Sequence, residues 1–66
     1  MLNFRLGDRV ILRFEPKIFG GEIITKPGGN PGGCCVKLDS EPISNWFLLS
    51  ELAFESPLVE LSRVLE

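Results

Sequence analysis

The sequence predicts a small, mostly β domain of about five strands, with a 3-10 turn and a short C-terminal helix or tail. Short apolar runs alternate with polar residues at a period of two, which is typical of half-buried strands. Clusters of glycine and proline separate these runs and indicate turns. A chain of 66 residues is one domain with a small core. We expect residues 1–55 to form a barrel and residues 56–66 to form an amphipathic tail.

The first strand is expected between Gly7 and Phe14, because its side chains alternate in character. The face toward the core holds Val10, Leu12 and Phe14, and the opposite face holds Arg9, Ile11 and Arg13. A proline and two glycines between residues 16 and 21 indicate a loop after this strand. Within the loop, Phe19 is expected to fold back onto the core.

Two further strands are expected on either side of a glycine-rich connection. The β-branched run Glu22–Lys26 predicts a strand antiparallel to the first. The connection Pro27–Gly33 lacks the order of residues that holds phosphate in glycine-rich loops, so we interpret it as a mobile hairpin connection. The third strand, Cys34–Asp39, is expected to bury Cys34, Val36 and Leu38 and to expose Cys35, Lys37 and Asp39.

The fourth strand is expected at Trp46–Leu49, after a polar turn. Its residues are apolar on both faces, which favours a place at the centre of a small barrel. Trp46 and Phe47 are neighbours, so one points inward and the other outward. We expect core packing for Trp46, with a partner-binding anchor as the alternative. A 3-10 turn at Ser50–Leu52 and a fifth strand at Ala53–Glu55 complete the predicted barrel.

A short amphipathic helix is predicted after the fifth strand. Ser56 is a typical N-cap and Pro57 suits the first helical position. One face is expected to hold Pro57, Leu58, Leu61, Val64 and Leu65, with Glu60 and Arg63 turned away. A helix shorter than about 12 residues is marginal alone in water, so this one must pack on the barrel, bind a partner or fray.

Charge is divided unevenly along the chain. Residues 1–38 carry six basic and three acidic side chains, and residues 39–66 carry one basic and six acidic side chains, which gives the net charge of −2. The chain can therefore present a basic face to an acidic partner. Alternatively, bases and acids on adjacent strands neutralise each other.

The residue types argue against catalysis and metal binding. The chain has no histidine, and its two cysteines, Cys34 and Cys35, are adjacent, so neither a zinc site nor a disulfide framework is expected. No nucleophile lies beside a base, and we expect no enzymatic activity and no cofactor. Residues 1–12 do not resemble a signal peptide, and no apolar run is long enough to span a bilayer, so a cytoplasmic location is expected.

Three runs together resemble a known group of small barrels: GDRV at Gly7–Val10, CCVKLD at Cys34–Asp39 and NWFLLSEL at Asn45–Leu52. They are similar to the SH3-like small subunits of cyanobacterial photosynthetic electron-transfer complexes. The most similar patterns are those of the ferredoxin-docking S subunit of the NDH-1 complex and the small peripheral P subunit of the cytochrome b6f complex. The resemblance implies an SH3-like barrel that helps an acidic ferredoxin or another soluble partner to dock on a membrane complex, at the cytoplasmic face of the thylakoid membrane.

We therefore expect a non-catalytic protein–protein interaction module, an accessory or docking subunit of such a complex. The expected partner-binding residues are Arg9, Arg13, Lys17, Phe19, Lys37 and Trp46. One alternative is a KOW-like nucleic-acid or ribosome-associated module, which shares the strand-and-turn signature. A negatively charged chain with interleaved carboxylates is poorly suited to neutralising phosphates, however. A second alternative is a regulatory adaptor that binds a signalling protein.

Overall fold

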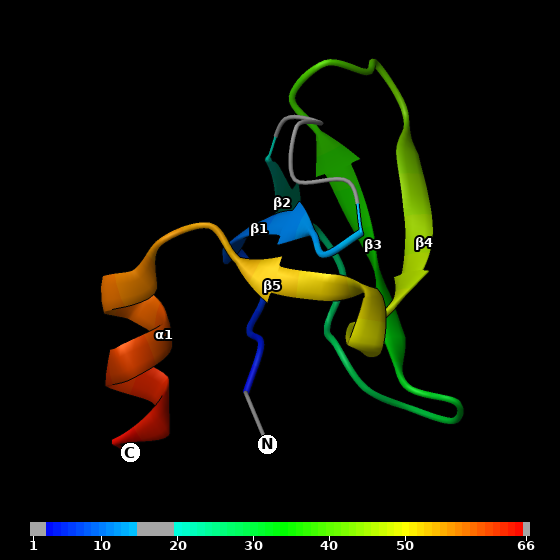
Figure 1. Ribbon diagram of the computed structural model, residues 1–66. Helices are drawn as coiled ribbons and strands as arrows, with labels where there is room; N and C mark the ends of the chain where they lie inside the picture. The colour runs from blue at the N-terminus through cyan, green and yellow to red at the C-terminus, as the bar shows by residue number, and fades with distance from the viewer. Residues whose placement is uncertain (1–2, 15–19, 66) are drawn as a thin grey trace.

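The computed structural model describes residues 3–14 and 20–65. Five strands form one antiparallel sheet in the order β4-β3-β2-β1-β5. A 3-10 turn links β4 to β5, and one helix follows β5 (Figure 1). The elements are β1 (Arg9–Leu12), β2 (Gly21–Ile23), β3 (Gly33–Leu38), β4 (Ser44–Leu48), η1 (Leu49–Glu51), β5 (Leu52–Phe54) and α1 (Pro57–Val64). The prediction of a mostly β fold with a 3-10 turn and a C-terminal helix is confirmed.

The short turn η1 connects β4 and β5, the two edge strands of the sheet. Strands β1, β2 and β3 each pair with the next strand in the chain, and β5 returns to pair with the other edge of β1. The Arg13 backbone N–H donates to the Glu51 carbonyl at 2.9 Å, which ties the end of β1 to η1. Within residues 3–14 and 20–65 no pairing of β4 with β5 is present, so these strands are the two edges of an open sheet.

The core lies on one face of the sheet and draws its fully buried residues from every strand except β4. Its members are each at most 5% exposed: Val10, Ile23, Cys34, Val36, Leu38, Leu52 and Phe54. The predicted alternation of β3 is confirmed, since Cys34, Val36 and Leu38 are buried together. Burial, with a smaller contribution from the neighbouring Cys35, raises the pKa of the Cys34 thiol. Cys34 is therefore an unreactive core residue.

Strand β4 lies at an edge of the sheet, so its predicted place at the centre of a barrel is wrong. Trp46 pairs with Cys35 on the outer face and is 53% exposed, which overturns its expected burial in the core. Its indole ring instead lies over Gly33, where a Cβ atom would collide with the ring and come within 2.6 Å of the Phe47 carbonyl oxygen. Phe47 points to the other face and packs half-buried against the core.

Several predicted boundaries shift by one to three residues. Strand β1 ends at Leu12, and Phe14 lies beyond the last β1–β5 pair in a turn, where it is 79% exposed rather than buried. Strand β2 ends at Ile23, because the Thr25 hydroxyl replaces a backbone carbonyl as the acceptor for the Cys35 N–H at 2.9 Å. Both η1 and β5 begin one residue earlier than predicted.

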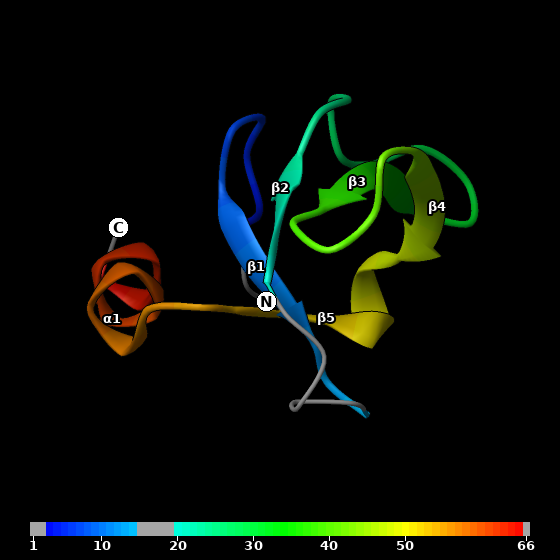
Figure 2. The same cartoon turned by 90° about the horizontal axis from the view of Figure 1, so that it is seen from above.

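Helix α1 begins at Pro57 as predicted, with Ser56 at the N-cap, although the Ser56 side chain makes no capping hydrogen bond. Its orientation is the reverse of the one expected for a helix that packs its apolar face on the barrel. No residue of α1 is buried, and Leu58 and Leu61 are 78% and 55% exposed. Figures 1 and 2 show α1 standing beside the end of the sheet rather than covering it.

Arg63, expected to point away into solvent, attaches α1 to the rest of the domain. Its guanidinium donates to both carboxylate oxygens of Asp8, at 2.7 and 2.8 Å, and to the Asn3 carbonyl oxygen at 2.7 Å. It also lies 5.4 Å from the centroid of the Phe54 ring, whose other neighbour is the Phe4 ring at 4.6 Å. The side chains of Arg63 and Asp8 are only 11% and 12% exposed. A long-range ion pair, rather than apolar packing, therefore fixes the helix.

Candidate functional site

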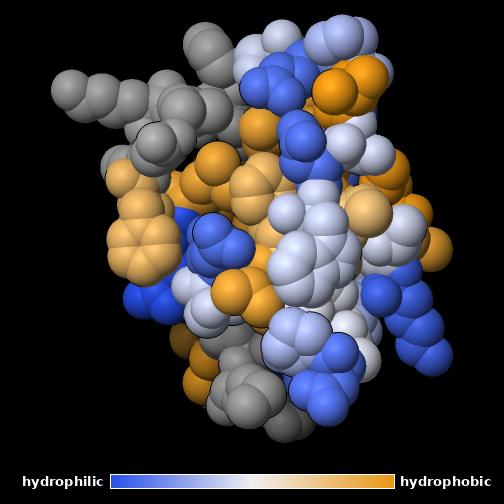
Figure 3. Space-filling view, turned by 90° about the vertical axis from the view of Figure 1, so that its right-hand side faces the viewer, coloured by the Kyte–Doolittle hydropathy of each residue, from blue (hydrophilic) through white to orange (hydrophobic). Residues whose placement is uncertain are grey.

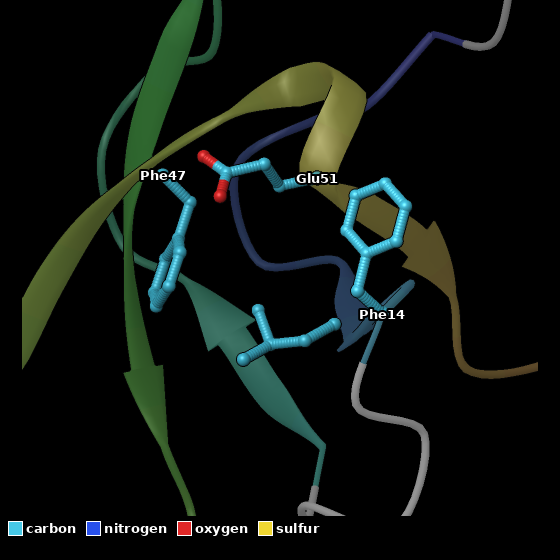
Figure 4. A pocket seen from close by; sticks show the side chains of 4 residues that line it. Phe14, Phe47 and Glu51 are labelled. Atoms are coloured by element: carbon cyan, nitrogen blue, oxygen red, sulfur yellow. The ribbon is translucent and has the colours of Figure 1, made fainter.

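A hollow of about 240 Å³ opens where the end of β1 faces β4 and η1. The described residues that line it are Leu12, Phe14, Phe47 and Glu51. In Figure 4, Phe14 and Phe47 stand on opposite sides of the hollow and Glu51 lies between them at its rim. The hollow is open to solvent and has apolar walls and one acidic group.

Each lining side chain is placed by a different element. Leu12, the last residue of β1, is half-buried. Phe47 reaches the hollow from the inward face of β4, while Phe14 stands free in the turn after β1. The Glu51 carboxylate accepts the Leu48 backbone N–H at 2.9 Å through Oε1, which fixes Glu51 at the end of η1. The site is therefore partly preformed, with Phe14 as its most exposed member.

The hollow is small and combines apolar walls with a single carboxylate. Pockets for small molecules typically enclose about 300–1,000 Å³ and surround their ligand. This hollow is smaller and offers a single carboxylate, which can accept a hydrogen bond or face a cation.

Arg9, one base of the predicted basic face, is neutralised within the chain. The Arg9 guanidinium pairs with the Asp39 carboxylate and, at 3.1 Å, with Glu55. Hydrogen bonds from Arg9 lower the pKa of Asp39, and the two carboxylates raise the pKa of Arg9 above its usual value. Strand register also places Glu22 between Arg9 and Lys37. The alternative that bases and acids neutralise each other is confirmed at Arg9, and partner binding by this residue stays a prediction.

Among the described residues, the predicted site residues Arg13 and Lys37 do not line the hollow. Arg13 is exposed after β1, and its side chain forms no ion pair with another of the described residues. Lys37 is half-buried and its Nζ donates to the Leu38 carbonyl oxygen at 2.8 Å. Lys17 and Phe19 lie outside the described residues. Their roles in partner binding remain predictions.

Trp46 belongs to a second apolar surface, on the outer face of the sheet. The Ile24 backbone N–H donates to the Cys35 carbonyl at 3.0 Å, and Cys35 pairs with Trp46. Ile24, which directly follows β2, therefore forms a row with Cys35 of β3 and Trp46 of β4. Ile24 is 43% exposed. Figure 3 faces the side where β4 lies and shows apolar side chains between polar ones. The alternative that Trp46 is a partner-binding anchor thus remains open.

Sequence reasoning did not identify the hollow. Leu12 and Phe14 were assigned to the core by alternation alone, and Glu51 was read only as part of a turn. No sequence signal marks the hollow, because the exposure of Phe14 follows from the end of β1 pairing at Leu12 and Leu52, which only the structure shows.

The described part of the chain offers no group of three or more His, Cys, Asp or Glu side chains that could hold a metal ion. Across the same residues, no helix has the length and apolar character needed to cross a membrane. Comparison with protein-family models, curated proteins and solved structures found no match to this chain. A function is therefore inferred from the chain's own residues.

Proposed function

We propose that this chain is a non-catalytic protein–protein interaction module built on an SH3-like barrel. The observation that carries the proposal is the hollow between Phe14 and Phe47, with Glu51 at its rim. The order of five antiparallel strands, with a 3-10 turn between β4 and β5, supports an SH3-like barrel. The proposed barrel would bring its edge strands together beside η1, next to the hollow.

The partner is a protein segment that places an apolar side chain in the hollow and a lysine or arginine beside it. Phe14 is 79% exposed, so the segment can contact its ring without any rearrangement of the domain. Glu51 supplies the negative charge, and its position is fixed by the hydrogen bond to the Leu48 N–H. A few residues, often aromatic, typically supply most of the binding energy of a protein interface.

The charges favour a protein over a nucleic acid as the partner. Phosphate neutralisation supplies much of nucleic-acid affinity. The net charge of this chain is −2, and Arg9 is already paired with Asp39 and Glu55. The one carboxylate at the hollow would repel a phosphate backbone.

The proposal is tested by selecting binders from a random peptide library on the immobilised chain and measuring affinities in solution. We expect selected peptides to share an apolar residue next to a lysine or arginine. Phe14→Ala should weaken their binding at least about tenfold, because truncating an aromatic anchor typically costs more than about 1.4 kcal/mol. Glu51→Gln, which can still accept the Leu48 N–H, should weaken only the peptides with a basic residue.

The matched control is Ile43→Ala. Ile43 is 64% exposed and lies in the turn at the opposite end of β4 from Phe47. Binders that respond to Ile43→Ala and not to Phe14→Ala would place the interaction elsewhere. A library that yields no binder at all would also contradict the proposal.

A more specific proposal follows from the resemblance of three sequence runs to photosynthetic SH3-like subunits. In this proposal the chain is an accessory subunit that docks an acidic ferredoxin on a membrane electron-transfer complex. Arg13 is the better base for a test, because reversing Arg9 would also disturb Asp39 and Glu55. Arg13→Glu should abolish recovery of the complex or of ferredoxin from solubilised cyanobacterial membranes, whereas Lys26→Glu should not. Equal recovery by both variants would refute docking through Arg13.

A further inference from the structure

The most exposed apolar surface of the helix faces away from the sheet. Four side chains form it, and we call them the α1 apolar face: Leu58 (78% exposed), Leu61 (55%), Val64 (64%) and Leu65 (77%). Val59, on another side of α1, is only 37% exposed. Figures 1 and 2 show that no other described element covers the outer side of α1.

The position of Arg63 explains this orientation. At 3.6 residues per turn, Arg63 lies about 160–170° around the helix from the mean direction of Leu58, Leu61 and Leu65. Its guanidinium is held by Asp8 and by the Asn3 carbonyl oxygen. Because Arg63 must point toward the domain, the three leucines must point away from it. The exposure of the α1 apolar face is thus fixed by a half-buried ion pair and is not a consequence of loose packing.

The spacing of the leucines is that of a helix-pairing surface. Leu58, Leu61 and Leu65 are separated by three and four residues, the a-d-a spacing of helices that pack side by side. The flanking residues at the e and g positions are Ser62 and Val64, which carry no charge. Glu60 and Arg63 fall at the c and f positions, away from the contact.

We propose that the α1 apolar face pairs with the same face of a second copy of this chain, with the two helices antiparallel about a twofold axis. A twofold contact places the same residues on both sides, so it needs a surface that can face itself. Because the flanking residues Ser62 and Val64 are uncharged, a twofold contact brings no like charges together at the e and g positions. They also offer no charge that would select a basic or acidic partner. This inference does not depend on the hollow between Phe14 and Phe47.

A lipid surface fits the α1 apolar face less well. Helices that lie on membranes typically carry lysine or arginine along their polar side. The one base of the helix, Arg63, is engaged by Asp8, and the exposed charged residue of the helix is Glu60. An anionic bilayer would therefore repel rather than attract this side of the molecule.

The size of the surface predicts a weak, concentration-dependent dimer. Stable protein interfaces usually bury more than about 1,000 Å² in total. The α1 apolar face has only four aliphatic side chains on a helix of eight residues, so the contact it can form is small. We expect association in the range of tens to hundreds of micromolar rather than an obligate dimer.

The test is sedimentation equilibrium of the full chain over a wide range of concentration, with a reductant present so that Cys35 cannot cross-link two copies. The apparent mass should rise from 7.3 kDa toward twice that value. Leu61→Lys should weaken association at least about tenfold, because a charge at the centre of the contact would face its own copy. The control Ile43→Lys places the same charge at a side chain that is 64% exposed but lies outside α1, and should leave association unchanged.

Circular dichroism should show that each variant keeps its fold. In NMR spectra of the wild type, the amide shifts that depend on concentration should be confined to residues 57–65. A chain that remains a monomer at all concentrations overturns the inference. So does a dimer that Ile43→Lys disrupts and Leu61→Lys does not. Binding to phosphatidylcholine vesicles that requires Leu61, by a chain that is monomeric in solution, would assign the α1 apolar face to lipid instead.

Discussion

Replacing Arg63 with Met should release α1 while the sheet stays folded. The change removes two hydrogen bonds to Asp8 and one to the Asn3 carbonyl, and it removes the cation beside the Phe54 ring. Hydrogen bonds to charged groups contribute about 1.5–3 kcal/mol, and a cation over a ring adds about 0.5–1 kcal/mol. Since both charged side chains are shielded from water, we expect attachment of α1 to weaken by about 2–4 kcal/mol.

Hydrogen exchange measures this loss at the helix itself. The Glu60 and Leu65 amides donate to Ser56 and Leu61 within α1, and their exchange should accelerate at least about 30-fold in the variant. The Val36 amide in the core of β3 should change much less. Ser62→Ala is the matched control, because it alters an exposed side chain of the same helix and leaves the ion pair intact.

The same ion pair should respond to acid. Burial alone raises the pKa of Asp8, but hydrogen bonds from the Arg63 side chain and the Arg5 backbone N–H lower it overall. A carboxyl whose pKa is lowered in the folded state stabilises that state above its unfolded pKa. Attachment of α1 should therefore weaken as the pH falls below about 4. Unchanged exchange at Glu60 and Leu65, both in Arg63→Met and in acid, would refute this account of how α1 is held.

Two further substitutions separate tight packing from exposed charge. Gly33→Ala should lower the free energy of unfolding by about 1–3 kcal/mol, because the added Cβ meets the Trp46 ring and the Phe47 carbonyl. Urea unfolding should show a lower midpoint with an unchanged slope, and an unchanged midpoint would contradict the prediction. Arg9→Met should lower the free energy of unfolding by less than about 1 kcal/mol, and high salt should remove this effect. The reason is that the side chains of Arg9, Asp39 and Glu55 are 41%, 50% and 42% exposed. A loss above about 2 kcal/mol would contradict this prediction.

Alternation along a strand was a good guide where a strand has a neighbour on both sides. It predicted the burial of Cys34, Val36 and Leu38, because β3 lies inside the sheet between β2 and β4. It failed at Phe14 and Trp46, because burial there depends on where β1 ends and which strand lies at the edge. Neither fact is present in the local spacing of apolar residues.

The orientation of α1 was unpredictable for a related reason. Helical spacing correctly grouped Leu58, Leu61, Val64 and Leu65 on one face, but it could not show which face meets the barrel. The deciding contact joins Arg63 to Asp8, which is 55 residues away in sequence. Similarly, the hollow combines residues from β1, β4 and η1, so it exists only after the sheet has bent these elements together.

The proposed binding site is tested most directly by mapping a selected peptide on the isotope-labelled chain by NMR. The account predicts that the largest shift changes on titration fall on Leu12, Phe14, Phe47 and Glu51, and that Phe14→Ala reduces them. Changes concentrated on α1 or on the row Ile24, Cys35 and Trp46, with the hollow undisturbed, would contradict the account.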